Sequence, residues 1–294
     1  SYEEIQAHQS KISGGISAAI KLQTKESLEP GTLFLSISSK CLEENFTNME
    51  DLITNTIQSV RFDEEQRILD LLNIFVARND ESLNQNGHYL AMNSAASPLN
   101  PLATTSFHLS GLQMIHRSKE LISKIQMDGD ASYVINILKN IHSKVSNNPY
   151  KIFTACSKDS LDNQLKESEV SPSRNEQQLI NATQSQIAWI TGSQVCYCAQ
   201  AFMGVSREHP DSAALSVLAT VLRNGFLHTA IREKGGAYGA GASNDTATNT
   251  FKLFSYRDPK CKETFQAFED AITWAKTSIN EQHLEEAILG VVSS

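Results

Sequence analysis

The sequence predicts an α+β fold, made of two similar units in which an antiparallel sheet carries helices on one face, with the second unit truncated. Two observations support this prediction. Segments far apart in the chain match in the same order, and short strands joined by turns alternate with amphipathic helices. Strands joined by short turns pair antiparallel, and helices must cover the apolar face of the sheet they form.

The internal repeat rests on three matches. QSKISGGISAAI resembles IREKGGAYGAGA, which places Gly14-Gly15 on Gly235-Gly236, 221 positions later. FLSISSKCLEENF resembles KLFSYRDPKCKETF at an offset of 220, and an amphipathic helix follows each segment. A weaker match pairs Glu65-Gln66 with Glu281-Gln282 at an offset of 216. The shared order and the nearly constant offset predict two copies of one structural unit.

The two copies are cut at different points, which divides the chain into three predicted parts. Residues 1–157 form a first unit whose start is missing by comparison with the second. Residues 158–178 are polar, are interrupted by Ser171-Pro172-Ser173, and are predicted to be a linker. Residues 179–294 form a second unit whose end is missing. The chain is therefore expected to be a piece of something longer.

Each expected element has a local signal. In the second unit a strand near 193–203 precedes a helix that Asp211 caps and that runs to about Lys234. Gly235 is expected to take the left-handed position that ends this helix. The elements expected after it are strands at 237–243 and 249–257, a turn at 244–249 and a helix at 262–278. In the first unit they are helices at 3–13 and 42–60 and strands at 16–22 and 31–38.

Composition excludes several classes of protein. The chain has 33 acidic and 25 basic residues, a net charge of −8, which argues against nucleic acid as a partner because phosphate binding needs a basic face. No stretch approaches the roughly 18 consecutive apolar residues of a membrane span. The start, SYEEIQAHQS, does not resemble a signal peptide. The expected compartment is the cytoplasm or an organelle matrix, with no membrane partner.

The sequence does not predict a metal site in this chain. It contains neither His-x-x-Glu-His nor His-Glu-x-x-His, and its eight histidines are scattered, so a lone histidine such as His108 or His142 is expected to be structural. Cys196 and Cys198 lie on the same face of an expected strand, but a zinc ribbon would need a second such pair. The two cysteines are therefore predicted to be small buried residues.

The run Arg232-Glu-Lys-Gly-Gly-Ala-Tyr238-Gly is the candidate site. Glycines between a helix and a strand allow another backbone to approach closely, which makes Gly235 and Gly236 candidate substrate-binding residues. Folding back at these glycines would bring Arg232 and Tyr238 to one place. A guanidinium can donate two parallel hydrogen bonds to a carbonyl, and a phenol can donate to an oxyanion. A structural alternative is that Arg232 caps its own helix and Tyr238 packs on the sheet.

The repeat bears on this alternative. The positions of the first unit that match Arg232 and Tyr238 hold Lys11 and Ser17. The fold therefore does not require arginine and tyrosine at these positions, and only the second unit carries them.

The same residues resemble a known family. IREKGGAYGAGA followed by FKLFSYRDP is similar to the carboxy-terminal half of the pitrilysin/insulinase-type (inverzincin) zinc metallopeptidases, in the presequence-protease branch. SKISGGISAAI, SSKCLEENF and MNSAASPLNP resemble the third domain of that branch, so the resemblance covers nearly the whole chain.

The resemblance implies a zinc endopeptidase of four similar domains, whose two halves close around a chamber that admits peptides and small unfolded chains. The amino-terminal half would hold the zinc and the general base, which this chain lacks, so the chain alone is expected to be inactive. The carboxy-terminal half would supply an arginine and a tyrosine for substrate binding and transition-state stabilisation, here Arg232 and Tyr238. The alternatives are a non-catalytic structural or substrate-holding subunit of the same fold, and a stand-alone binding module.

Overall fold

The computed structural model describes residues 2–23, 32–148, 150–156 and 185–293. These residues form two compact units, each built from segments that are distant in sequence. Of the described residues, the first unit draws on 2–21, 32–71 and 125–156, and the second on 22–23, 72–124 and 185–293. The predicted linker at 158–178 lies outside the described residues, so the three predicted parts of the chain stay a prediction.

The first unit combines a two-stranded sheet with helices. Its elements are α1 (Tyr2–Ile12), β1 (Ile16–Gln23), β2 (Thr32–Ser39), the 3-10 turn η1 (Glu43–Asn45), α2 (Phe46–Gln58) and α7 (Ser132–Asn147). α3 (Glu65–Gln85) begins in this unit, and α6 (Leu112–Asp128) ends in it. The ring Nε2 of His142 lies 2.7 Å from the Ile57 carbonyl oxygen, which joins α7 to α2. His142 is therefore structural, as predicted.

The second unit is built around a three-stranded antiparallel sheet in the order β3-β5-β4. Its elements are α4 (Gly87–Ala96), α5 (Pro101–Ser110), β3 (Ala199–Met203), α9 (Ser212–Leu222), η2 (Arg223–Glu233), β4 (Gly239–Asp245), β5 (Thr250–Tyr256), α10 (Lys262–Thr277) and α11 (Glu281–Val292). The predicted β4–β5 hairpin and the helix after it are confirmed. α9 begins directly after Asp211, although the Asp211 side chain makes no capping hydrogen bond.

Asp245 closes the β4–β5 hairpin. Its carboxylate accepts hydrogen bonds from the backbone N–H groups of Ala247 and Thr248 and from the Lys252 ammonium group, whose nitrogen lies 2.6 Å away. Burial opposes ionisation of Asp245, but the charge and hydrogen bond of Lys252, together with the hydrogen bonds from Thr248, outweigh it and lower the pKa of the carboxyl. The turn is therefore held by a charged group that stays ionised near neutral pH.

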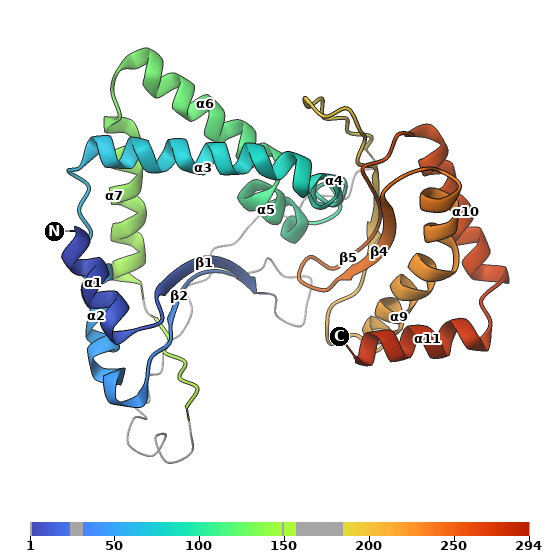
Figure 1. Ribbon diagram of the computed structural model, residues 1–294, viewed down its shortest axis with the longest axis horizontal. Coiled ribbons are helices and arrows are strands. Elements are labelled where there is room, and N and C mark those ends of the chain that lie inside the picture. Colours follow the sequence, from blue (N-terminus) through green and yellow to red (C-terminus); the bar gives the residue numbers. More distant parts are fainter. Residues whose placement is uncertain (1, 24–31, 149, 157–184, 294) are drawn as a thin grey trace. The chain divides into compact units, whose positions relative to one another are not determined.

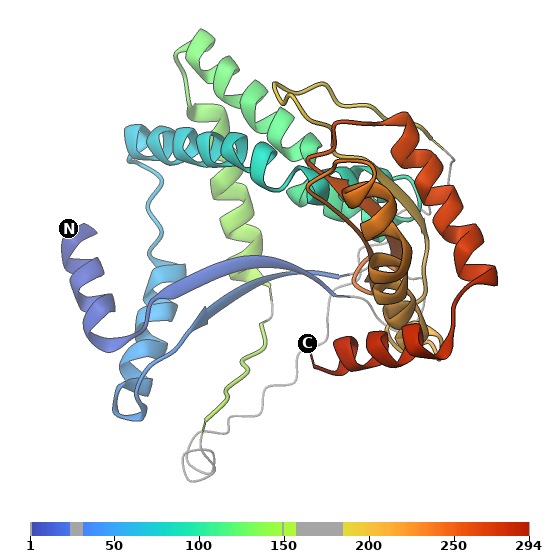
Figure 2. The ribbon, with the colours of Figure 1, turned by 45° about the vertical axis from the view of Figure 1, so that its right-hand side comes forward.

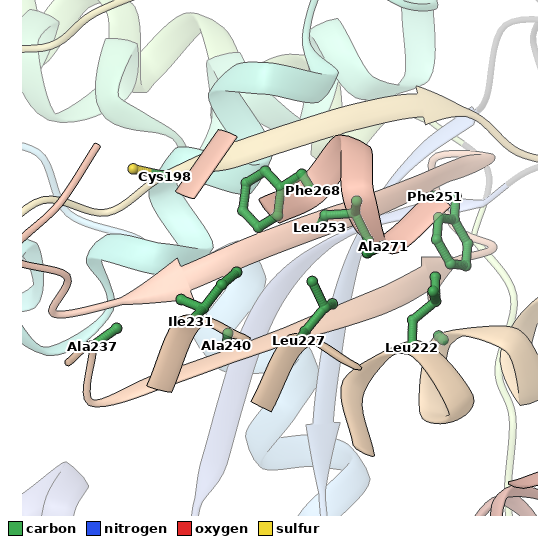
Figure 3. Close-up of a cluster of buried hydrophobic side chains, with 11 residues drawn as sticks. Cys198, Leu222, Leu227, Ile231, Ala237, Ala240, Phe251, Leu253, Phe268 and Ala271 are labelled. Atoms are coloured by element: carbon green, nitrogen blue, oxygen red, sulfur yellow. The ribbon is translucent and has the colours of Figure 1, made fainter. Parts of the chain in front are cut away.

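One face of the sheet meets α9, η2 and α10 in an apolar core. Phe251 and Leu253 lie two residues apart on β5, so both side chains point into this core. There they contact Leu227 and Ile231 of η2 and Phe268 of α10 (Figure 3). Leu253, Leu227 and Phe268 are fully buried. Burying each such side chain contributes about 1.5–3 kcal/mol, so this core is the main stabilising element of the second unit. α11 packs on α9 (Figures 1 and 2).

Helices also cover the opposite face of this sheet, whereas the sequence predicted helices on one face. α4 lies on this opposite face (Figure 1). Phe254 and Tyr256 point away from the core, and the His88 ring centroid of α4 lies 5.5 Å and 4.9 Å from their ring centroids. β5 carries large apolar groups on both faces, so both faces need a cover. Burial lowers the pKa of His88, which keeps the ring neutral in this aromatic contact.

The continuous helix Ser212–Glu233 is long and apolar enough to cross a membrane by length and composition alone. The sequence did not lead us to expect this. Its most apolar side chains, Leu222, Leu227 and Ile231, pack on the sheet and are at most 2% exposed. The core of this unit therefore accounts for part of this apolar character, since 28% of the apolar window is buried.

The described elements follow the same order in the two matched segments. Each has a helix, two strands and two further helices, and the second glycine of each pair has a positive φ, +100° at Gly15 and +86° at Gly236. Among the described residues, however, the β1–β2 sheet has no third strand to match β3. That the segments are copies of one unit therefore stays a prediction.

The hydrogen bonds of Asn100 yield a first test. Its buried side chain accepts from the Ala103 N–H at 2.9 Å, which caps α5, and donates to the Thr248 carbonyl at 2.9 Å. We expect Asn100→Ala to lower the free energy of unfolding of the second unit by about 2 kcal/mol, because a cap is lost and a buried carbonyl loses its donor. Urea unfolding followed by tryptophan fluorescence measures this, since both tryptophans belong to that unit.

Asn86 provides the matched control. It is exposed and precedes α4 without making a side-chain capping bond, so Asn86→Ala should change stability by less than about 0.5 kcal/mol. Equal effects of the two substitutions would contradict this account of α5.

Candidate functional site

The candidate site lies where the helix Ser212–Glu233 ends and the edge strand β4 begins. The helix is α-helical to Leu222 and π-helical from Arg223 to Glu233. In its last turn the Lys234 N–H donates to the Thr229 carbonyl at 3.0 Å, the five-residue spacing of a π-helix. The predicted end near Lys234 is confirmed, but the sequence did not predict the π-helical form.

The glycine that ends the helix is Gly236. Gly236 has φ of +86°, whereas Gly235 does not have a positive φ, so the predicted role of Gly235 as the left-handed residue is wrong. The Gly236 N–H donates to the Arg232 carbonyl at 3.0 Å, and the Ala237 N–H donates to the Ile231 carbonyl at 3.1 Å. These two hydrogen bonds close the helix as in the usual glycine helix end, but each spans one residue more because the preceding turn is π-helical.

The glycines of the run have different roles. A Cβ at Gly235 would lie 2.3 Å from the Ile231 carbonyl oxygen, and one at Gly241 would lie 3.0 Å from the Phe254 ring. These two glycines are required by contacts inside the fold. At Gly236 and Gly239 the nearest atoms to such a Cβ, in Pro259 and Tyr256, lie 3.7 Å and 3.8 Å away. Close approach of another backbone is therefore possible at Gly236 and Gly239.

Arg232 is exposed in the last helical turn. Its Nη1 lies 3.3 Å from Nε2 of His228, and Nδ1 of the same imidazole lies 3.4 Å from a carboxylate oxygen of Glu233. The guanidinium therefore contacts a neighbouring side chain, whereas the structural alternative had it cap its own helix. His228 was missed by the sequence analysis, although its spacing of four residues from Arg232 was a visible signal.

Tyr238 stands on the other side of the glycine turn. Its backbone N–H donates to the Arg257 carbonyl at 3.2 Å, and its ring meets the edge of Tyr256 with centroids 5.6 Å apart. The side chain is nevertheless 67% exposed, and no described residue hydrogen-bonds to its phenol. Tyr256 is in turn flanked by Tyr197 and by the Arg257 guanidinium. The Tyr238 ring is therefore packed against Tyr256 on one side, whereas its hydroxyl is accessible to solvent.

The two side chains are both exposed at one turn, but no contact between them is recorded among the described residues. The Arg232 carbonyl and the Tyr238 N–H are each fixed by backbone hydrogen bonds, to Gly236 and Arg257 respectively. That both side chains act on one substrate group stays a prediction.

The described residues contain no group of three histidine, cysteine or acidic side chains that could hold a metal ion. Cys198 is buried, as predicted, and burial together with the neighbouring Cys261 raises the pKa of its thiol to about 12. Cys196 is exposed, so the prediction that it is buried is wrong. It pairs with Asp258 only as an isolated bridge, at a position before β3 begins.

Comparison with known families finds two matching regions that together cover most of the chain. Residues 133–291 match the family model described as the Peptidase M16 inactive domain, and residues 1–121 match the model of the associated domain of M16 peptidases of subfamily C. The chain belongs to the M16 peptidase family. The resemblance inferred from the Arg-Glu-Lys-Gly-Gly-Ala-Tyr-Gly run is therefore confirmed.

Curated relatives carry the description mitochondrial presequence protease. The chain is 27% identical to that of Yarrowia lipolytica over 290 residues, which are 95% of this chain and 29% of the relative. It is 28% identical to that of Mus musculus, covering 92% of this chain and 29% of the relative. For Drosophila melanogaster the identity is 30%, covering 99% and 29%. The chain thus spans about three-tenths of the length of these relatives.

The glycine contacts predict a pair of contrasting substitutions. Gly235→Ala should lower the free energy of unfolding by about 2 kcal/mol, because its methyl group would overlap the Ile231 carbonyl oxygen. Gly239→Ala places its methyl at an ordinary contact distance and should change stability by less than about 0.5 kcal/mol. Urea unfolding of the two variants measures both changes in the free energy of unfolding. A destabilised Gly239→Ala beside a stable Gly235→Ala would show that the turn differs from this description.

Proposed function

We propose that this chain is the substrate-binding and transition-state-stabilising part of a zinc-dependent M16 endopeptidase, whose zinc and general base lie in an amino-terminal part outside this chain. The observation that carries the proposal is that an exposed guanidinium and an exposed phenol flank one glycine turn. Its substrates would be peptides and small unfolded chains, enclosed in a chamber formed by the two parts.

Arg232 suits the recognition of a peptide carbonyl. A guanidinium has five N–H donors, and the contact with His228 occupies one of them. The remaining donors can form two parallel hydrogen bonds to substrate oxygens, and the planar group fixes their direction. The exposed position of Arg232 leaves room for a substrate to reach it.

Tyr238 suits the stabilisation of a developing negative charge. Its hydroxyl has no hydrogen-bond partner in the described part of the chain, so it can donate to an oxyanion without breaking a bond within the protein. The contact with Tyr256 restricts the ring, which reduces the ordering required when the substrate arrives. Donors arranged in advance around a developing charge are usually the largest single contribution to catalysis.

The strand that follows supplies a place for the substrate backbone. β4 is an edge strand of its sheet. The Tyr238 N–H points toward β5, so the alternation of an antiparallel ladder directs the backbone groups of Gly239 away from β5. No side chain stands at Gly239, and a peptide in extended form can pair there.

A bound zinc would supply the activated water that attacks the peptide bond. The residues of this chain would bind the substrate carbonyl and the oxyanion, and the described residues hold no ligand set for the metal. The relatives are described as mitochondrial, which supports the organelle matrix as the compartment.

A second candidate function is a non-catalytic, substrate-holding subunit. The matched model is described as an inactive domain, which is compatible with either function. Zinc content separates the two, because a holding subunit needs no metal in the complete protein.

Replacing Tyr238 by Phe tests the proposal. In the complete peptidase, with the zinc-bearing part present, we expect kcat to fall about 100-fold, the usual cost of removing one oxyanion donor. KM and zinc content should change little, because the phenol would act only in the transition state. Tyr150, which is 73% exposed, is the matched control, and Tyr150→Phe should leave kcat unchanged. An unaltered kcat in the Tyr238→Phe enzyme would refute the assigned role.

A further inference from the structure

His228 is placed by the π-helix between two charged side chains. It lies four residues before Arg232 and five before Glu233, with contacts of 3.3 Å and 3.4 Å to them. A π-helical turn closes on the fifth residue, so the fourth and fifth residues after His228 both lie beside it. In an α-helix the fifth residue would turn away from this side. The π-helical form is therefore what gives the imidazole both partners at once.

The two partners assign the tautomer of the imidazole. The Glu233 carboxylate lies 3.4 Å from Nδ1 of His228, and its negative charge favours a proton on that nitrogen. Nε2 is then unprotonated, and it accepts a hydrogen bond from the Nη1 of Arg232. The order is carboxylate, imidazole, guanidinium, and each contact is compatible with the next. A neutral histidine with the proton on Nδ1 satisfies both neighbours.

We propose that His228 is a positioning residue for Arg232, oriented by Glu233, and that it holds the guanidinium ready for the substrate. The proposal rests on the proposed function of Arg232. An exposed arginine has many rotamers, and a substrate that binds it must restrict them. A neighbouring acceptor that restricts them in advance improves binding and catalysis without touching the substrate.

The exposure of these groups argues that the arrangement does not serve folding. The side chains of His228 and Glu233 are 42% and 56% exposed, and such surface pairs contribute little to stability. The same chain contains a comparable exposed pair, His116 and Glu120 at 3.2 Å. This second pair is the natural control.

A double-mutant cycle on Arg232 and His228 tests the proposal. In the complete peptidase we expect His228→Ala to lower kcat/KM for a quenched fluorescent peptide about tenfold. His228→Gln, whose carbonyl oxygen can replace Nε2 as the acceptor, should recover most of the loss. In an Arg232→Ala background, His228→Ala should have no further effect, because it acts only through the guanidinium. His116→Ala should leave kcat/KM unchanged.

The outcomes distinguish the positioning role of His228 from the proposed function of Arg232. Independent, multiplicative losses from the two substitutions would overturn the positioning role while leaving Arg232 a substrate ligand. A silent His228→Ala beside an impaired Arg232→Ala would do the same. An Arg232→Ala enzyme of normal activity would overturn both the positioning role and the proposed function of Arg232.

A spectroscopic readout on this chain does not depend on activity. The ¹⁵N chemical shifts of the neutral His228 ring should show a protonated Nδ1 and an unprotonated Nε2, and Glu233→Ala should weaken this preference. A predominant Nε2–H tautomer in the unsubstituted chain would contradict the proposal, because that nitrogen could not then accept from Arg232.

Discussion

The site depends on how one helix ends. Ile231 and Ala237 are buried on either side of the glycine pair, and the Ala237 N–H donates to the Ile231 carbonyl across the turn. Gly236 supplies the left-handed residue that this bond requires, and Gly235 keeps a methyl group away from the same carbonyl. Because Ile231 and Ala237 are buried on the two sides of the turn, the residues next to them project outward. Arg232 and Tyr238 owe their exposure to this constraint.

The sheet then fixes the strand that follows the turn. β5 buries Leu253 on one face, and on the other its Tyr256 contacts the rings of His88 and Tyr238. Because His88 belongs to α4, a helix far from the site in sequence supports the ring beside the candidate oxyanion donor. This explains why the second compact unit includes residues from the first half of the chain. The strand β5 therefore belongs both to the core of the fold and to the support of the candidate site.

The parts of the fold that the sequence predicted are those with local signals. The glycine pair and the β4–β5 turn interrupt regular apolar patterns, and both were located correctly. The π-helical form of Arg223–Glu233 was not predicted, because π-helices are rare and no residue pattern in this segment marks one. For the same reason the left-handed glycine was predicted at Gly235, one position before Gly236. The packing of α4 on the sheet is a long-range contact with no local signal, whereas His228 was detectable by its spacing from Arg232.

The most direct test of the account is cleavage of a quenched fluorescent peptide by the complete protein, with and without a chelator, alongside its zinc content. The account predicts about one zinc per complete protein, as expected of a single catalytic site. It also predicts cleavage that the chelator abolishes and that returns when zinc is restored. A metal-free protein that cleaves no peptide would contradict the assignment of this chain to a working peptidase. Its M16 fold would then serve to hold substrates.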